Sequence, residues 1–138
     1  MKKTQSGASC RSATSLTTES MRPLYPRRGE IWRVNFDPSL GSEIQKTRPA
    51  VVLSSDGIGR LPIKLVAPIT EWKRRFSGNL WHIRIEPNAV NSLAKVSAVD
   101  VLQVRGIDTQ RFVERLGQVS ETSMEEIVSA LALVVEYQ

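Results

Sequence analysis

The sequence predicts a mainly β fold, in which short strands form a small β-barrel and a C-terminal helix covers part of it. Three observations predict this fold: short stretches with alternating apolar side chains, turns rich in Gly, Pro, Asn and Asp between them, and a helical apolar period near the chain end. With 138 residues, the chain is long enough for one hydrophobic core. We therefore expect a single folded domain.

Five strands are expected before the helix. The first is the clearest, because large apolar side chains recur at every second position, at Trp32, Val34 and Phe36. The second is continuously apolar and is expected at the centre of the sheet, whereas the fifth is expected to be bent. The expected strands cover residues 30–36, 50–54, 63–69, 81–85 and 95–104.

The end of the chain predicts a helix. Apolar residues follow the i, i+3, i+4, i+7 spacing of one helical face, at Met124, Ile127, Val128, Leu131, Val134 and Val135. We expect a capping box at the start of this helix, formed either by Thr122 with Glu125 or by Ser123 with Glu126.

Residues 1–27 are expected to form a disordered tail. The first twenty residues contain nine Ser or Thr and almost no bulky apolar side chain, so they cannot drive burial. Met21 is an alternative start of the natural product, in which case this segment is not translated. The folded domain is then expected over residues 28–138.

Composition excludes several kinds of site. Cys10 is the only cysteine and His82 the only histidine, so the chain cannot form an intrachain disulfide, a clustered thiolate site or a His-rich zinc site. The ordinary His-His ribonuclease and Ser-His-Asp constellations are excluded as well, because only one histidine is present. We expect no metal, no cofactor and a reducing, cytoplasmic setting. No apolar run approaches the ~18 residues of a membrane span, so no membrane association is expected.

Charge is unevenly distributed along the chain. Residues 21–106 contain 14 Lys or Arg against 7 Asp or Glu, whereas residues 107–138 contain 2 against 6. A basic body with an acidic end favours a polyanion at one surface, such as RNA or an acidic protein segment. An ordinary soluble surface is the alternative explanation.

Arg48 is the first candidate for chemistry. It follows a polar loop at residues 37–47 and precedes Pro49, which holds its backbone extended. Its planar guanidinium matches phosphate oxygens and stays charged at any relevant pH. The alternative is a structural ion pair with Glu30, Asp37 or Glu43.

Three cations and two aromatic rings form a second candidate, at Trp72, Lys73, Arg74, Arg75 and Phe76. This composition suits phosphate contacts and base stacking on single-stranded RNA. The alternative is a solvated loop whose two rings pack into the core. His82 is most simply a residue on the polar face of a strand, with a smaller chance of serving a reaction.

Several motifs together resemble the MazF/PemK toxin family of type II toxin-antitoxin systems. They are Gly29-Glu30-Ile31-Trp32, Phe36-Asp37-Pro38, Gly41-Ser42-Glu43, and the run from Lys46 through Arg48-Pro49 to Ser54. Residues 67–70, 99–107 and 121–135 resemble later parts of the family, so the likeness spans residues 29–136. Any one of these pieces is weak by itself.

The resemblance implies an SH3-like barrel, a homodimer, and an endoribonuclease that cuts single-stranded RNA at short sequences without metal. It implies a cognate antitoxin, whose acidic C-terminal segment would bind the groove built for RNA. The catalytic positions map onto Arg48 and Thr70, with capping of a turn as the alternative role of Thr70. The residues expected to bind RNA are Gly41, Ser42, Glu43, Lys46, Thr47, Lys73, Arg74 and Arg75.

The chain departs from the family pattern at three places. Glu71 is an acid where many relatives carry a small or amide side chain. The catalytic aspartate of the Kid-like subgroup would fall near Leu102, so the acid-base scheme of that subgroup is not carried over. The turn at residues 55–60 is short, which we expect to trim the RNA-binding edge.

Two other functions fit the same kind of scaffold. One is a non-enzymatic toxin that traps DNA gyrase, comparable to CcdB-like toxins. The other is a barrel that binds RNA without cutting it. Arg48 together with Thr70 favours cleavage, because neither alternative has an evident need for that pair.

Overall fold

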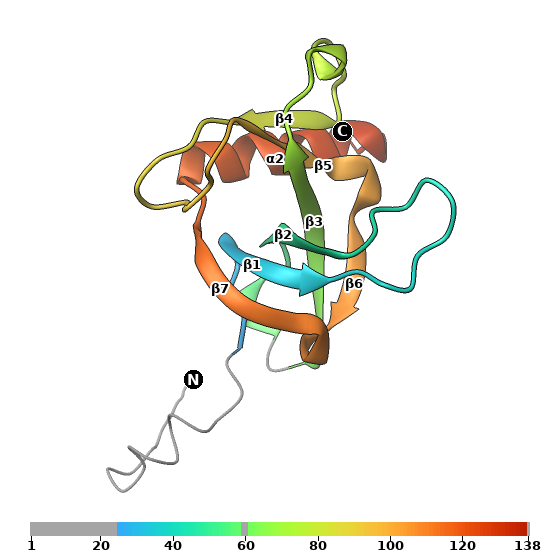
Figure 1. Ribbon diagram of the computed structural model, residues 1–138, viewed down its shortest axis with the longest axis vertical. Coiled ribbons are helices and arrows are strands. Elements are labelled where there is room, and N and C mark those ends of the chain that lie inside the picture. The colour runs from blue at the N-terminus through green and yellow to red at the C-terminus, as the bar shows by residue number, and fades with distance from the viewer. Residues whose placement is uncertain (1–24, 59–60, 138) are drawn as a thin grey trace, which may run out of the picture.

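Figure 1 shows the computed structural model, which describes residues 25–58 and 61–137, as one curved sheet with a C-terminal α-helix laid across it. The strands are β1 (Glu30–Asn35), β2 (Thr47–Val52), β3 (Ile63–Glu71), β4 (His82–Ile85), β5 (Ser97–Asp100), β6 (Arg105–Asp108) and β7 (Phe112–Gln118). Four 3-10 turns, η1 (Asp56–Ile58), η2 (Arg74–Phe76), η3 (Val101–Gln103) and η4 (Thr109–Arg111), lie between strands, and α2 (Glu121–Val134) ends the fold. The predicted mainly β fold with a C-terminal helix is confirmed.

The N-terminal tail predicted at residues 1–27 lies mostly outside the described residues, which begin at Tyr25. Pro26 is buried, and the backbone N–H of Arg27 donates to Glu30 Oε1 at 2.9 Å. The chain therefore contacts the sheet from these residues onward.

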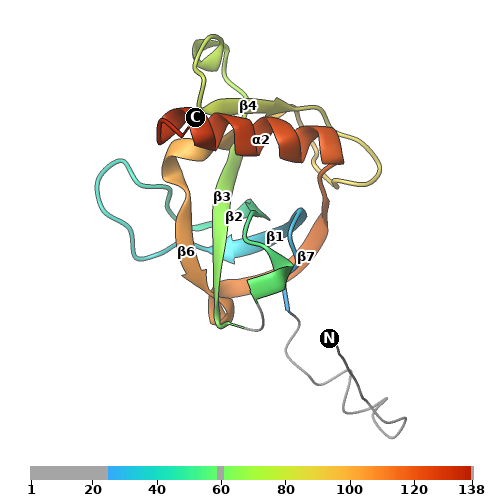
Figure 2. The ribbon, with the colours of Figure 1, turned by 180° about the vertical axis from the view of Figure 1, so that it is seen from behind.

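β3 is the central strand of the sheet. The strands pair antiparallel in the order β4-β5-β3-β2-β1-β7, while β6 pairs with the first half of β3 and β5 with its last three residues. β4 and β7 are the edges, so the described sheet is curved like a barrel without being closed by hydrogen bonds. Figures 1 and 2 both show α2 lying across this open side, next to β4.

The core has two parts because both faces of the central strands are buried. Ile31 and Val51 belong to the cluster that packs beneath α2, where Met124 and Ile127 cover it. A second cluster contains Trp32, Val34, Phe36, Ala50, Val52, Val66 and Ile107. The predicted common face of Trp32, Val34 and Phe36 is confirmed, as is the central position of β2.

The fifth predicted strand, over residues 95–104, is wrong in its extent. The chain leaves β5 after Asp100 because the Asp100 carboxylate accepts a hydrogen bond from the backbone N–H of Leu102 at 3.1 Å and starts η3. β6 then begins at Arg105. β7 was not predicted, because it is an edge strand with two irregularities in its pairing to β1 and has only one fully buried residue, Gly117.

α2 begins at Glu121 and ends at Val134, close to the predicted bounds. Its start differs from the prediction, since Ser120 is the N-cap and its hydroxyl accepts from the backbone N–H of Ser123 at 3.1 Å. Ala130 is buried beside Met124 and Ile127, whereas Val128 and Val135 of the predicted face are exposed. Within the described residues, no helix combines the length and the apolar character that a membrane crossing requires.

Glu30 joins three segments at the start of the sheet. Its Oε1 accepts from Trp32 Nε1 and from the Arg27 backbone at 2.9 Å each, and its Oε2 accepts from Arg115 Nε on β7 at 2.9 Å. Burial raises the pKa of this carboxyl, but the hydrogen bonds from Trp32, Arg27 and Arg115 outweigh it, so the pKa lies below its ordinary value. The ionised carboxylate therefore stabilises the fold.

The substitution Glu30→Gln is expected to lower the free energy of unfolding at neutral pH by about 1–3 kcal/mol, because a neutral amide replaces the charged carboxylate that faces Arg115. The matched control is Glu114→Gln, which removes the more exposed ion pair with Arg33 and should cost about 0.5 kcal/mol or less. Urea unfolding measures both. The effect of Glu30→Gln should shrink as the pH falls below about 4.5, where the unfolded chain takes up the proton first, and should be lost as the pH falls through the lower folded-state pKa. Equal losses in the two variants would contradict this account.

Candidate functional site

The pairing of β2 with β3 brings Arg48 and Thr70 to one place. Ala50 faces Pro68 in this antiparallel register, so continuing it by two residues sets Arg48 against Thr70. Both side chains line a cavity of about 500 Å³, together with Ile44, Glu71, Lys73, Arg75, Phe76, His82, Asp100 and Gln103. The two positions predicted to be catalytic therefore lie at one concave site.

Arg48 is exposed and held by its own loop. Its Nε donates to the carbonyl of Gln45 at 3.1 Å, and no carboxylate of the described residues pairs with it. The three acids considered as partners have other roles: Glu30 binds Arg115, Asp37 accepts from the Lys46 backbone, and Glu43 accepts from the Leu40 backbone. The structural ion pair is therefore not formed, which leaves the guanidinium available to bind an anion at the cavity that Arg48 lines.

Thr70 is half-buried on β3, where its backbone pairs with Ala98 of β5. Its hydroxyl makes no hydrogen bond to another described residue, so the alternative role as a turn cap is not observed. A hydroxyl at this position can donate to an oxygen bound beside Arg48.

An aspartate and the histidine complete the cavity wall, and sequence reasoning missed the aspartate. Asp100 on β5 faces His82 on β4, with His82 Nε2 3.7 Å from Asp100 Oδ2. The Leu102 position expected for a family aspartate lies on η3 and is 56% exposed. As a correction, the structure brings a carboxylate to the site from two residues earlier, because Asp100 ends β5 opposite His82, whereas Leu102 lies on the 3-10 turn that follows.

The His82 ring is fixed on both sides. Phe76 stacks on it with ring centroids 3.8 Å apart and planes 10° apart, and Asn79 Nδ2 lies 3.1 Å from its Nδ1. Because the Asn79 amide donates, Nδ1 accepts and the proton is assigned to Nε2, on the side of Asp100. The His82 side chain is only 9% exposed and lines the cavity. It is therefore not simply a residue on the polar face of a strand.

Burial lowers the pKa of His82, Asp100 raises it by a smaller amount, and nearby Arg75 has the smallest effect and lowers it. The ring is therefore neutral at pH 7. A neutral imidazole with its proton on Nε2, 3.7 Å from Asp100 Oδ2, presents the positive end of an N–H dipole to this carboxylate without cancelling its negative charge.

The residues predicted to bind RNA fall into three groups. Lys73 and Arg75 line the cavity with Arg48, whereas Ser42 and Glu43 line a neighbouring cavity described below. Gly41, Lys46, Thr47 and Arg74 are exposed nearby and line neither cavity.

Residues 72–81 form a projecting β3–β4 arm, visible at the top of Figure 1. Trp72 and Phe76 pack edge to face with ring centroids 5.8 Å apart, and Arg84 lies over the Trp72 ring at 5.5 Å. Neither ring belongs to the two core clusters. The alternative that they pack into the core is therefore wrong, and they stabilise the arm instead.

Two departures from the family pattern have clear places in the structure. Glu71 lines the cavity, and its Oε2 lies 3.9 Å from Lys95 Nζ, which partly balances its charge. The short turn after β2 lies at the opposite end of that strand from Arg48, where Asp56 accepts from the Arg28 backbone at 2.9 Å. The described part of this turn therefore does not border the site.

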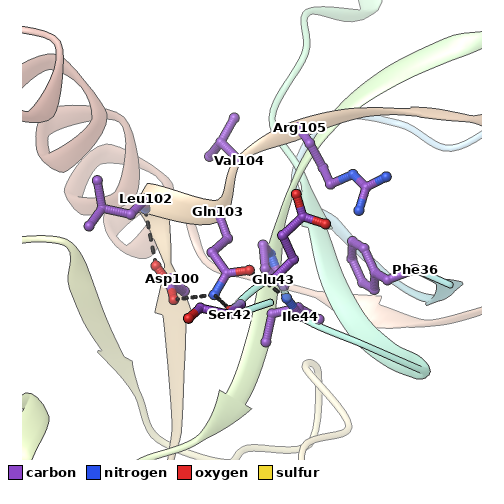
Figure 3. A pocket seen from close by; sticks show the side chains of 10 residues that line it. Phe36, Ser42, Glu43, Ile44, Asp100, Leu102, Gln103, Val104 and Arg105 are labelled. Carbon is purple, nitrogen blue, oxygen red and sulfur yellow. Dashed lines mark hydrogen bonds between the residues drawn. The ribbon is translucent and has the colours of Figure 1, made fainter. Parts of the chain in front are cut away.

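Gln103 connects the site to the β1–β2 loop, as Figure 3 shows. Its Oε1 accepts from the Ile44 backbone N–H at 2.6 Å, while its Nε2 lies 3.3 Å from Asp100 Oδ2 and 3.4 Å from the Ser42 carbonyl. One amide thus holds both the loop and the carboxylate. Sequence reasoning did not single out Gln103, because its partners in the β1–β2 loop lie about sixty positions away along the chain.

No metal site accompanies these residues: in the part of the chain that the structure describes, no three His, Cys, Asp or Glu side chains gather in a way that could hold an ion.

Comparison with known proteins identifies the class. The family described as PemK-like, MazF-like toxin of type II toxin-antitoxin system matches residues 27–135. The chain belongs to this family.

Individual relatives agree with this assignment. The chain is 34% identical over 112 residues to the endoribonuclease toxin ChpB of Escherichia coli, covering 79% of this chain and 93% of that protein. It is 32% identical over 114 residues to endoribonuclease MazF9 of Mycobacterium tuberculosis, covering 78% and 93%. A solved mycobacterial endoribonuclease in complex with its cognate antitoxin has the same fold, with a TM-score of 0.66 at 18% identity over 82% of this chain and 97% of that one.

Removing the Gln103 amide is expected to loosen the β1–β2 loop. In Gln103→Leu the Ile44 N–H loses its acceptor, so its hydrogen exchange should accelerate by about 2- to 10-fold, the equivalent of one hydrogen bond. Gln110→Leu, an exposed glutamine on η4, is the matched control and should leave Ile44 unchanged. Unchanged exchange in Gln103→Leu would show that the amide does not hold the loop.

Lowering the pH below about 6.5 is expected to destabilise the fold through His82. Since the pKa of His82 is lowered in the folded protein, the unfolded chain takes up a proton at a pH at which the folded chain does not. The stabilising contribution is complete above that pH and is lost as the pH falls through the folded-state pKa. Urea unfolding at several pH values should therefore show a steeper fall for the wild type than for His82→Gln. The same pH dependence of the unfolding free energy in both proteins would contradict this role of His82.

Proposed function

We propose that this chain is the toxin of a type II toxin-antitoxin system and a metal-independent endoribonuclease that cuts single-stranded RNA by attack of a ribose 2′-hydroxyl. The observation that carries the proposal is the concave site in which Arg48, without a carboxylate partner among the described residues, lies beside Thr70 and the Asp100–His82 pair. The endoribonucleases among its relatives support the same reaction.

Arg48 and Thr70 stabilise the phosphate during the reaction. As the 2′-oxygen bonds to phosphorus, negative charge grows on the two non-bridging oxygens. The guanidinium of Arg48 donates to these oxygens, and the Thr70 hydroxyl adds a donor from the neighbouring strand. Both groups are held by β-strands, so they need little reorganisation when RNA binds.

Asp100 is the group that we assign as the proton acceptor, since a guanidinium cannot take that role. Its carboxylate takes the proton of the 2′-hydroxyl. The Gln103 amide donates a hydrogen bond to this carboxylate at 3.3 Å, and the His82 ring lies 3.7 Å from it. The bond from phosphorus to the 5′-oxygen breaks, and this oxygen takes up a proton from a water molecule at the open mouth of the cavity. The products are a 2′,3′-cyclic phosphate and a 5′-hydroxyl.

The charge around the site fits its two polyanionic partners. Lys73 and Arg75 extend the positive surface beside Arg48 and match an RNA backbone. The carboxylates of an acidic antitoxin segment compete for the same cations, so the bound antitoxin blocks the entry of RNA. On the basis of family membership we also propose that the toxin is a homodimer, and that it acts in the cytoplasm.

Incubating the purified protein with a long single-stranded RNA in EDTA tests the proposed reaction. We expect discrete cuts that leave 5′-hydroxyl ends, and no cut where the nucleotide before the scissile phosphate is a deoxynucleotide, which lacks the nucleophile. Arg48→Ala should lower the cleavage rate ~100- to 1,000-fold, and Thr70→Val and Asp100→Asn should lower it as well. Arg33→Gln removes a cation that pairs with Glu114 and lines neither cavity, so it is the matched control and should cut normally.

Two outcomes would overturn the proposal. Cleavage that disappears in EDTA would require a metal. Intact RNA, combined with inhibition of DNA supercoiling by gyrase, would favour a non-enzymatic toxin.

A further inference from the structure

A second cavity adjoins the site. It has a volume of about 570 Å³ and shares Ile44, Asp100 and Gln103 with the first cavity. Its remaining walls come from the β1–β2 loop and from the start of β6, as Figure 3 shows. A chain bound with its phosphate at Arg48 would therefore pass this cavity with its next nucleotide.

Two charged groups of opposite sign face this cavity without pairing with each other. Glu43 Oε1 accepts from the Leu40 backbone N–H at 2.8 Å, which fixes the carboxylate, and its second oxygen has no partner among the described residues. The Arg105 guanidinium lies 5.8 Å from the centroid of the Phe36 ring and has no carboxylate partner in the described part of the chain. Figure 3 shows the Glu43 carboxylate and the Arg105 guanidinium at the same opening.

The lining between these charged groups is apolar. Pro68 and Phe36 are buried beneath the opening, and Ile44 and Val104 are half-buried at its sides. A planar ring with a polar edge matches such a cavity, since the ring face packs on apolar side chains while the edge meets a hydrogen-bond donor and an acceptor.

We propose that this second cavity binds the base of a nucleotide next to the scissile phosphate and prefers a base with an exocyclic amino group, that is adenine, cytosine or guanine, to uracil. The inference deepens the proposed function and rests on it. The Glu43 carboxylate can only accept hydrogen bonds and so receives the amino group, while Arg105 donates to the adjacent ring nitrogen or carbonyl. Uracil offers a single N–H between two carbonyl oxygens, which the carboxylate repels.

Gln103 connects the proposed base-binding cavity to the site of the reaction. Its amide holds the backbone of Ser42 and Ile44 on either side of Glu43, and it also donates to Asp100. The residue that reads the base is thus fixed relative to the residue that takes the proton. Fixed relative positions of this kind make cleavage depend on the base as well as on binding.

The test compares four RNA oligonucleotides that differ only in the base at one flanking position, after the cut sites in a long RNA have identified the two flanking positions. For the wild type, kcat/KM should be about tenfold or more higher for at least one amino-bearing base than for uracil at one of these positions. Glu43→Gln, which exchanges an acceptor oxygen for a donor amide, should reduce this ratio to about threefold or less, and Arg105→Gln should reduce it as well. Glu114→Gln, the control, should keep the wild-type ratio.

Three results would overturn the inference. The first is a wild type that does not discriminate against uracil at either flanking position. The second is a Glu43→Gln variant that lowers kcat/KM equally for all four oligonucleotides. The third is that the Glu43→Gln and Arg105→Gln variants change only their oligomeric state, measured by sedimentation, and keep the wild-type preference between bases. The cavity would then be an interface between copies of the chain.

Failure of the proposed function can be distinguished from failure of this inference. If the wild type cuts no RNA, fluorescence anisotropy with the same four oligonucleotides measures their affinities directly. A weaker affinity for uracil, lost in Glu43→Gln, would support base recognition in a protein that does not cleave. Equal affinities, or no binding, would overturn the base-recognition proposal.

Discussion

The register between β2 and β3 is the constraint on which the rest of the site depends. Ala50 faces Pro68 and Val52 faces Val66, and both faces of these strands are buried in one or the other core cluster. Because side chains alternate with a period of two, a slip of one residue would exchange the two faces and turn Arg48 away from Thr70. Burial on both sides makes such a slip costly, so hydrophobic packing fixes the position of a polar pair at the strand ends.

The site is built from parts of different rigidity. Arg48, Thr70, Asp100 and His82 lie in or next to strands, whereas Glu43 belongs to a loop that Gln103 attaches to the sheet through backbone hydrogen bonds. The chemistry we assign to the strand residues needs fixed distances, while recognition of bases tolerates variation in loops. The proposed division between cleavage and base recognition therefore follows the division between sheet and loop.

Local patterns in the sequence predicted the elements whose burial is regular. The alternation of Trp32, Val34 and Phe36 and the helical spacing around Ile127 each report one buried face, so the first strand and the C-terminal helix were correctly predicted. β7 escaped prediction because an irregular edge strand has no such alternation. The resemblance to a known family pointed to Arg48 and Thr70, but Asp100 and Gln103 gain their places only from η3 and from contacts far apart in sequence, which no local pattern contains.

The stacking of Phe76 on His82 links the projecting β3–β4 arm to the interior of the site. A peripheral segment of this kind is usually free to diverge, because little depends on it. Here a substitution of Phe76 alters the packing of an imidazole that adjoins the assigned proton acceptor. The shape of this arm is therefore tied to the rate of the reaction, since a remodelled arm that lacks an aromatic ring against the histidine leaves that imidazole without its stacking partner.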